Sequence, residues 1–262
     1  MNTSALTSSK GGERQVDKLI IKSFATRSEM GAFAAAEIAQ DLRARLDRQE
    51  RVRMVFAAAP SQRDVLDALA RSEGVDWTRV EAFHMDEYVG LAEDAPQRFG
   101  NWLGRHFFDL VPLAKVHRMM PGNDPAATAR EYADLLSAAP IDVIQLGIGV
   151  NGHVAFNDPP VARFDDPEKV KIVELDNVCR QQQVDDDCFE RFEDVPARAI
   201  TLTVPCLMSA ERLFCMVPGQ TKRAAVKAAL EGPITTACPA SILRQHPACT
   251  LYLDQDSDPH AR

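Results

Sequence analysis

The chain has 262 residues, a formal net charge of −8 and a hydrophobic content of 45%. This length suits one large α/β domain or two small ones, and the apolar content is enough for a sizeable core. The acidic balance argues against a nucleic-acid-binding protein, although local charge still permits an anionic ligand. No run of about 18 apolar residues occurs, so the sequence predicts no transmembrane helix and no membrane partner.

The first fifteen residues, MNTSALTSSKGGERQ, are polar and do not read as a targeting sequence. We therefore expect a disordered N-terminal arm at residues 1–15, a single domain at 16–255 and a short tail at 256–262. All six cysteines lie in the second half and none forms a CxxC pair, so we expect reduced thiols and no metal site. These features suit a cytoplasmic protein.

Apolar runs typical of β-strands alternate along the chain with segments typical of helices. The strand-like runs lie at residues 17–24, 52–59, 80–85, 116–120, 141–149, 169–175, 199–204, 213–218 and 249–254. The helix-like segments lie at about residues 27–49, 61–72, 97–109, 125–136, 221–230 and 239–245. Thr26 and Glu29 have the spacing of a capping box before the first helix. This alternation predicts an α/β fold, a Rossmann-like three-layer α/β/α sandwich with a mostly parallel sheet and helices on both faces.

Open α/β sheets bind ligands beyond the carboxyl ends of their strands, so the segments that follow the strands are candidates for a site. The strand at 52–59 is followed by Pro60-Ser61-Gln62-Arg63. Helical backbone N–H groups there would form an anion site, and Arg63 would add charge. An ordinary N-cap with a solvated arginine explains the same residues, and this segment alone favours that simpler interpretation.

Two adjacent carboxylates, Asp86 and Glu87, follow the strand at 80–85. Because they point in different directions, at most one of them can face a pocket and act as a general base. A pair of salt-bridge formers in a loop remains an equal alternative. Gly219 and Lys222 follow the strand at 213–218, where a glycine turn and a lysine in a first helical turn suit phosphate, although the spacing is not that of a Walker loop.

The most informative segment is DVIQLGIGVNGHVAFNDPP, residues 142–160. An apolar strand is followed there by a loop of glycines and polar residues, namely Gly147, Gly149, Asn151, Gly152, His153, Asn157 and Asp158. A histidine five residues before a carboxylate is a candidate acid/base with its orienting partner. A lone histidine is more often structural, but its place in a tight glycine loop at a strand end favours a catalytic role.

Three motifs resemble the glucosamine-6-phosphate deaminase/isomerase family. They are FHMDEYVGL (83–91), LGIGVNGHVAFNDPP (146–160) and VPGQTK (217–222), and they occur in the family's order. The resemblance spans about residues 17–255. The related 6-phosphogluconolactonases share the GxGxxGH core, but the segment that follows the histidine here is similar to the deaminases.

The resemblance implies conversion of an amino-sugar 6-phosphate and water into a ketose 6-phosphate and ammonia, without a metal or an organic cofactor. His153 would shuttle the proton during ring opening, and Asp86 would move a proton from C2 to C1. The family has an aspartate two residues before the histidine and a glutamate five residues after it. Because this chain has Asn151 and Asp158 there, we expect Asp158 alone to supply the charge that orients His153.

The resemblance also implies a sugar-phosphate site. Its predicted substrate-binding residues are Ala59, Ser61, Gln62, Arg63, Glu87, Gly147, Gly149, Gly152, Arg180 and Lys222. Lys222 matches the family's phosphate lysine, whereas Arg180 lies a few positions earlier than the family's arginine and the loop at 57–63 lacks a glycine. The expected partner is a small amino-sugar phosphate, of the glucosamine or galactosamine type, and the family also permits a homo-oligomer.

Two other functions stay open at this point. A sugar-phosphate lactonase would hydrolyse a lactone and release acid without ammonia. A non-catalytic sugar-phosphate sensor would use the same fold, because fold alone does not fix function. The presence of both Asp86 and His153, together with an N-terminal arm too short for a helix-turn-helix, favours an enzyme.

Overall fold

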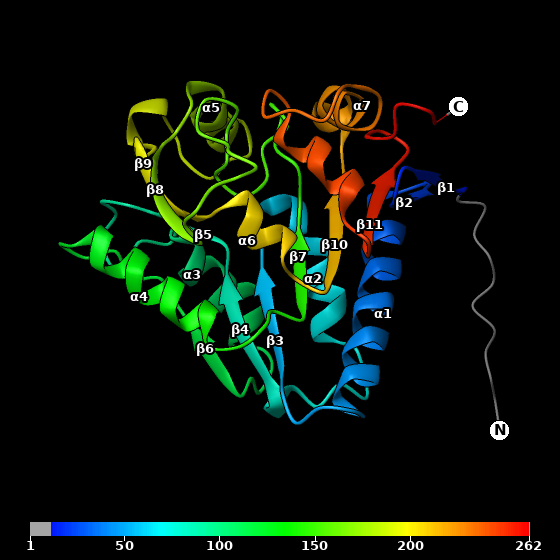
Figure 1. Ribbon diagram of the computed structural model, residues 1–262, viewed down its shortest axis with the longest axis horizontal. Coiled ribbons are helices and arrows are strands. Elements are labelled where there is room, and N and C mark those ends of the chain that lie inside the picture. The colour runs from blue at the N-terminus through cyan, green and yellow to red at the C-terminus, as the bar shows by residue number, and fades with distance from the viewer. Residues whose placement is uncertain (1–11, 262) are drawn as a thin grey trace.

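The computed structural model describes residues 12–261, and its centre is an eight-stranded sheet of order β1-β2-β11-β10-β7-β3-β4-β6 (Figure 1). Among these strands only β1 runs antiparallel to its neighbour. The strands of this sheet are β1 (Glu13–Val16), β2 (Leu19–Phe24), β3 (Val52–Phe56), β4 (Val80–His84), β6 (Lys115–His117), β7 (Val143–Leu146), β10 (Arg212–Val217) and β11 (Cys249–Asp254).

A second, antiparallel sheet of order β5-β9-β8 lies at the upper left in Figure 1. Its strands are β5 (Asp86–Tyr88), β8 (Val170–Glu174) and β9 (Arg198–Leu202). The α-helices are α1 (Arg27–Leu46), α2 (Arg63–Ala70), α3 (Phe99–Leu103), α4 (Pro125–Ser137), α5 (Asn177–Asp185), α6 (Val204–Met208) and α7 (Arg223–Glu231). Short helical turns are η1 (Pro60–Gln62), η2 (Trp77–Arg79), η3 (Gly104–Phe108), η4 (Phe192–Asp194), η5 (Gln220–Lys222) and η6 (Pro239–Gln245).

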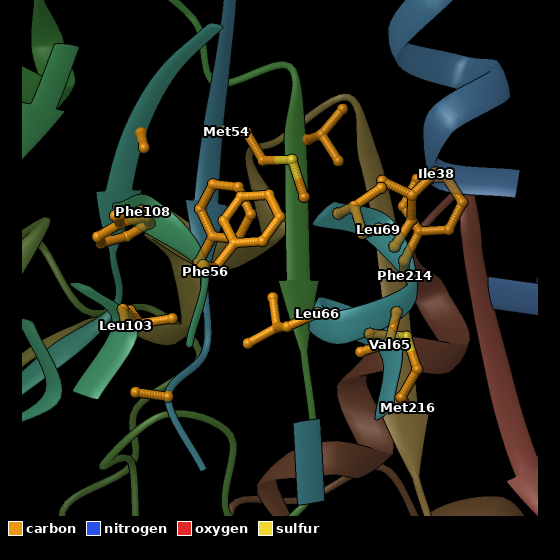
Figure 2. Packing of buried hydrophobic residues seen from close by; sticks show 14 of the residues in the cluster. Ile38, Met54, Phe56, Val65, Leu66, Leu69, Leu103, Phe108, Phe214 and Met216 are labelled. Atoms are coloured by element: carbon orange, nitrogen blue, oxygen red, sulfur yellow. The ribbon is translucent and has the colours of Figure 1, made fainter. Parts of the chain in front are cut away.

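The buried strands supply apolar side chains to two cores, one on each face of the large sheet, because successive side chains of a strand point to opposite faces. On one face Phe56 of β3 and Phe214 of β10 join α1 and α2, as Figure 2 shows for Ile38 and Leu66. On the other face Val55 of β3 packs in a cluster with α4, α6 and α7. The predicted three-layer α/β/α sandwich is therefore confirmed.

Several sequence predictions match the structure, but some elements were missed. Thr26 caps α1, since its hydroxyl accepts a hydrogen bond from the Glu29 N–H at 3.1 Å. The sequence did not predict β1, β5, α5 or α6. The missed elements β5 and α6 have only three and five residues, too few for a hydrophobic period to show.

The N-terminal arm was predicted to extend too far into the chain. Residues 1–11 lie outside the described part, but Glu13–Val16 forms β1 and pairs with β2. Arg14 also binds the carboxylate of Asp258 in the tail through two hydrogen bonds, at 2.9 and 2.6 Å. This ion pair therefore connects the first strand to a buried carboxylate near the other end of the described chain.

The order of the strands fixes where a ligand can bind. From β3 the chain passes through α2 to β4, towards one edge of the sheet, whereas from β7 it continues towards β10 on the other side. The loops that leave these two neighbouring strands diverge, and such a point opens a crevice at the carboxyl ends. In residues 12–261 no helix is both long and apolar enough to cross a bilayer.

Truncation of Phe56 tests the α1/α2 face of this core. Phe56 is fully buried, and its ring centre lies 5.0 Å from that of Phe107 and 5.4 Å from that of Phe108. The cavity left by Phe56→Ala should lower the free energy of unfolding, measured in urea, by about 3–5 kcal/mol. The control Leu110→Ala removes a side chain that is 60% exposed and should cost no more than about 0.5 kcal/mol. Equal losses in the two variants would contradict this description of the core.

Candidate functional site

A pocket opens at the carboxyl ends of β3 and β7, where the loops that follow these two strands diverge. Its walls come from the loops after β3, β7 and β10, from β5 and from α5. The lining residues are Ala57, Ala58, Ala59, Ser61, Gln62, Met85, Asp86, Phe99, Gly147, Ile148, Gly149, His153, Ala155, Phe156, Gln182, Gln183, Asp186 and Lys222. Eight of the predicted site residues are among them: Ala59, Ser61, Gln62, Asp86, Gly147, Gly149, His153 and Lys222.

The glycines of the loop after β7 let the backbone approach neighbouring groups closely. A Cβ atom on Gly149 would lie 2.0 Å from the ring of His153, so only glycine leaves room for that ring. Gly152 lies outside the pocket lining, but it has a φ of +84° and a Cβ there would lie 2.8 Å from the Cys238 Sγ. Gly149 therefore makes room for the His153 ring, and Gly152 makes room for the Cys238 side chain.

The ring of His153 is held from behind by Asn151 and Asp158. Its Nδ1 lies 2.8 Å from the Asn151 Oδ1 and 2.9 Å from the Asp158 Oδ1. The Asn151 side-chain amide also donates to the Asp158 Oδ1, at 2.9 Å. Because both ring partners are oxygen acceptors, Nδ1 carries the proton and Nε2 is left to exchange a proton with a ligand.

Asp158 is the charged member of this set. Burial alone would raise its pKa, but the hydrogen bonds from His153, Asn151 and the Asp176 N–H outweigh burial and leave the pKa below its usual range. Asp158 is fully buried and stays ionised, so it can stabilise a protonated His153. Asn151 orients the ring but adds no charge.

Asp86 enters the same pocket from β5, where it lies opposite Thr201 of β9. Its backbone carbonyl accepts a hydrogen bond from the His84 Nδ1 at 2.8 Å, and the His84 Nε2 accepts one from the Met119 N–H. Burial lowers the pKa of His84 to about 4, so this histidine stays neutral and connects the backbone of Asp86 to that of Met119. The Asp86 carboxylate has no hydrogen-bond partner among residues 12–261.

The environment of Asp86 suits a general base. Burial, followed by the charge of Glu87, raises the pKa of Asp86 well above its usual range. A carboxylate with a raised pKa binds a proton more strongly than an exposed one, which improves its use as a base near neutral pH. The structure thus brings a carboxylate with a raised pKa and a histidine from different strand ends to one cavity.

Glu87 does not line the pocket, although the sequence placed it among the predicted substrate-binding residues. Its carboxylate points away from the pocket and accepts hydrogen bonds from the N–H groups of Tyr88, Phe99 and Gly100, at 2.9 to 3.0 Å. The guanidinium of Arg98 lies 3.7 Å away. Neighbouring residues of a strand face opposite sides, so Asp86 meets the pocket while Glu87 fixes the start of α3.

Two predicted arginines also lie outside the pocket. Arg63 is exposed and pairs with Asp67 one helical turn on, at 3.7 Å. Arg180 stacks over the ring of Phe192 at 4.1 Å and donates to the carbonyl of Val195. Both guanidiniums are therefore engaged elsewhere, and the simpler interpretation of the segment after β3 holds for Arg63.

Lys222 supplies positive charge to the pocket lining. It is 4% exposed, and burial lowers its pKa even though the nearby carboxylate of Asp186 acts in the opposite direction. Among the described lining residues it is the only lysine or arginine. An anionic group of a ligand would therefore bind here.

Sequence reasoning missed Gln145, a buried amide that connects the strand ends beside the pocket. Gln145, at the third position of β7, accepts from the Ala57 N–H at 3.0 Å and donates to the Gln62 Oε1 at 2.5 Å. Gln62 donates in turn to the carbonyl of Met216 at 3.1 Å. A buried glutamine inside an apolar strand was the available signal, because such a residue needs partners that the strand itself cannot provide.

His153, Asp158 and Cys179 have potential metal-ligand atoms within 4.8 Å of one another. Zinc and similar ions bind cysteine as the thiolate. Burial raises the pKa of the Cys179 thiol well above its usual range, and His153 and Asp158 already bind each other. We assign the three residues to the hydrogen-bond network of the site rather than to a metal.

The sequence of this chain is similar to those of known proteins. Residues 25–252 match the model of the family described as glucosamine-6-phosphate isomerases/6-phosphogluconolactonase. The chain belongs to this family. The glucosamine-6-phosphate deaminase of Exiguobacterium sibiricum is 35% identical over 188 residues, 71% of this chain and 73% of that protein. The deaminase of Lactobacillus helveticus is 36% identical over 177 residues, 66% of this chain and 71% of that protein.

Two solved structures have a fold similar to that of this chain. A monomeric glucosamine-6-phosphate deaminase superposes with a TM-score of 0.83 at 25% identity, over 90% of this chain and 98% of that one. A 6-phosphogluconolactonase from Shewanella baltica gives a TM-score of 0.76 at 19% identity, over 92% and 100% of the two chains. The second similarity supports the fold alone.

The raised pKa of Asp86 predicts a pH-dependent cost to stability. Above the unfolded-state pKa of about 4 the unfolded carboxylate is ionised while folding opposes the charge, so the cost is present at neutral pH and disappears below that value. Asp86→Asn should therefore melt at a higher temperature than the wild type at pH 8, and the difference should vanish near pH 4. A variant no more stable than the wild type at pH 8 would contradict the buried-carboxylate description.

Proposed function

We propose that the protein converts glucosamine 6-phosphate, or a close amino-sugar phosphate, and water into fructose 6-phosphate and ammonia. The observation that carries this proposal is the meeting of Asp86, His153 and Lys222 in one pocket. The first two offer a base and an acid/base, and the third offers a cation for the phosphate. Relatives named as glucosamine-6-phosphate deaminases, at about 35% identity over most of the chain, support the same activity.

His153 would open the sugar ring. The Nε2 of a neutral imidazole can take the proton of the C1 hydroxyl, and the resulting imidazolium can return it to the ring oxygen. The carboxylate of Asp158, 2.9 Å from Nδ1, stabilises the positive charge while it exists. Asn151 fixes the orientation of the His153 ring through its contacts to Nδ1 and to Asp158.

Asp86 would then carry out the isomerisation. It takes the proton from C2 of the open-chain aldose, which leaves an enolamine, and a proton returns to C1 to give an imine at C2. Water adds to C2 and ammonia leaves, so the ketose forms. Because C1 gains the hydrogen that C2 loses, the sugar supplies both the oxidation and the reduction, and the reaction needs no redox cofactor.

Direct measurement of the two products tests this proposal. The wild type should release ammonia and fructose 6-phosphate from glucosamine 6-phosphate in equal amounts, with galactosamine 6-phosphate assayed in parallel. Asp86→Asn should lower kcat by about 10²–10⁴-fold, the usual contribution of a positioned base. Acid release from 6-phosphogluconolactone without any ammonia from the amino sugar would instead assign the lactonase activity.

Replacement of Asp158 tests the hydrogen-bond set behind His153. Asp158→Asn keeps the shape but removes the charge that stabilises the imidazolium, so kcat should fall by about 10²-fold or more. The control Asp185→Asn changes an exposed carboxylate outside the pocket lining and should leave kcat unchanged. Unchanged turnover in Asp158→Asn would remove Asp158 from the catalytic set.

The setting of this activity is also a proposal. We infer that residues 16–255 act as one sugar-phosphate unit, that the enzyme is a cytoplasmic hydrolase, and that it serves the breakdown of N-acetylglucosamine. Self-association into a homo-oligomer is a further option, and the solved relative described as monomeric provides the alternative. Light scattering on the purified protein separates the two.

A further inference from the structure

The end of the pocket near Lys222 contains two opposite charges that do not bind each other. The Lys222 ammonium makes no hydrogen bond or ion pair with any residue of the range 12–261, although the side chain is 4% exposed. Asp186 lines the same pocket and is half-buried. The charge of its carboxylate acts to raise the pKa of Lys222, yet the two groups form no ion pair.

The Asp186 carboxylate is fixed in place at the C-terminal end of α5. Its Oδ2 accepts a hydrogen bond from the Gln182 amide at 3.1 Å, and the Gln182 Oε1 accepts one from the Val150 N–H at 2.9 Å. Val150 belongs to the glycine loop that carries His153. The Oδ2 atom of Asp186 is thus connected through Gln182 to the glycine loop, whereas its Oδ1 atom accepts no hydrogen bond in the described part of the chain.

A ligand that satisfies both groups must carry an acceptor beside a donor. A free phosphate ion would bind Lys222, but the Asp186 carboxylate would repel it. A sugar phosphate has a hydroxyl within a few bonds of its phosphate, and such a hydroxyl can donate to Asp186 while the phosphate contacts Lys222. A charged acceptor makes this hydrogen bond stronger than one between neutral groups.

We propose that Asp186 is a specificity-determining residue that binds the sugar hydroxyl nearest the phosphate and so selects polyol phosphates over phosphate ion. This inference rests on the proposed function, because it takes the anionic group at Lys222 to be a sugar phosphate. It assigns to α5 a role in substrate choice, in place of the arginine that the sequence suggested at position 180.

The test compares two ligands that do not react, inorganic phosphate and glucitol 6-phosphate, by isothermal titration calorimetry. Removal of the Asp186 charge relieves repulsion for both ligands, so the ratio of their dissociation constants isolates the hydroxyl contact. In Asp186→Ala the preference for glucitol 6-phosphate over phosphate should fall about tenfold, the loss expected for a hydrogen bond to a charged group. Asp186→Asn should lower the same ratio by less.

Asp185→Ala is the matched control, because Asp185 is the exposed neighbour that binds Gln181 outside the pocket. It should change the ratio by less than about twofold. An unchanged ratio in Asp186→Ala and Asp186→Asn would overturn the proposal, even if both ligands bound more tightly. Since the assay needs no turnover, absence of ammonia production together with a lowered ratio would reject the deaminase but keep the role of Asp186.

Discussion

The pocket depends on a single constraint, the adjacency of two parallel strands whose following loops diverge. Gln145 of β7 lies opposite Phe56 of β3, and its buried amide binds both the backbone of Ala57 and the side chain of Gln62. The further bond from Gln62 to Met216 extends this connection to the end of β10. The ends of three strands are thereby held at fixed spacing, and the loops that carry Ser61, His153 and Lys222 meet around one cavity.

The site also shows how one strand can give two adjacent carboxylates different roles. Glu87 accepts three backbone hydrogen bonds and serves the fold, whereas Asp86 faces the cavity and is left without a partner among the described residues. An unpaired buried carboxylate and a buried ammonium both cost stability. Such costs are typical of functional sites, where stability is given up for reactivity.

Local patterns in the sequence predicted much of this arrangement. The glycine at 149, the histidine at 153 and the Thr26 cap are short-range features, so their structural roles follow from neighbouring residues. The residues that sequence reasoning missed depend on distant partners. Nothing local shows that Gln145 reaches Gln62, or that Asp186 lies near Lys222.

The misplaced residues have the same explanation. Arg180 resembles a substrate arginine by its position in the chain, but its contact with the Phe192 ring exists only in the fold. Glu87 could be separated from Asp86 only once β5 was seen to pair with β9, which determines the side that each carboxylate faces. Short strands carry too little pattern to reveal this in advance.

The central claim is that Asp86 removes the hydrogen at C2 of the substrate, and isotope labelling tests it most directly. Glucosamine 6-phosphate that carries deuterium at C2 is incubated with the enzyme in ordinary water, and the position of the label is followed by NMR. The account predicts that the wild type removes the label from C2 and returns part of it to C1 of fructose 6-phosphate, whereas Asp86→Asn leaves it at C2. Loss of the label from C2 at the wild-type rate in Asp86→Asn would contradict the account.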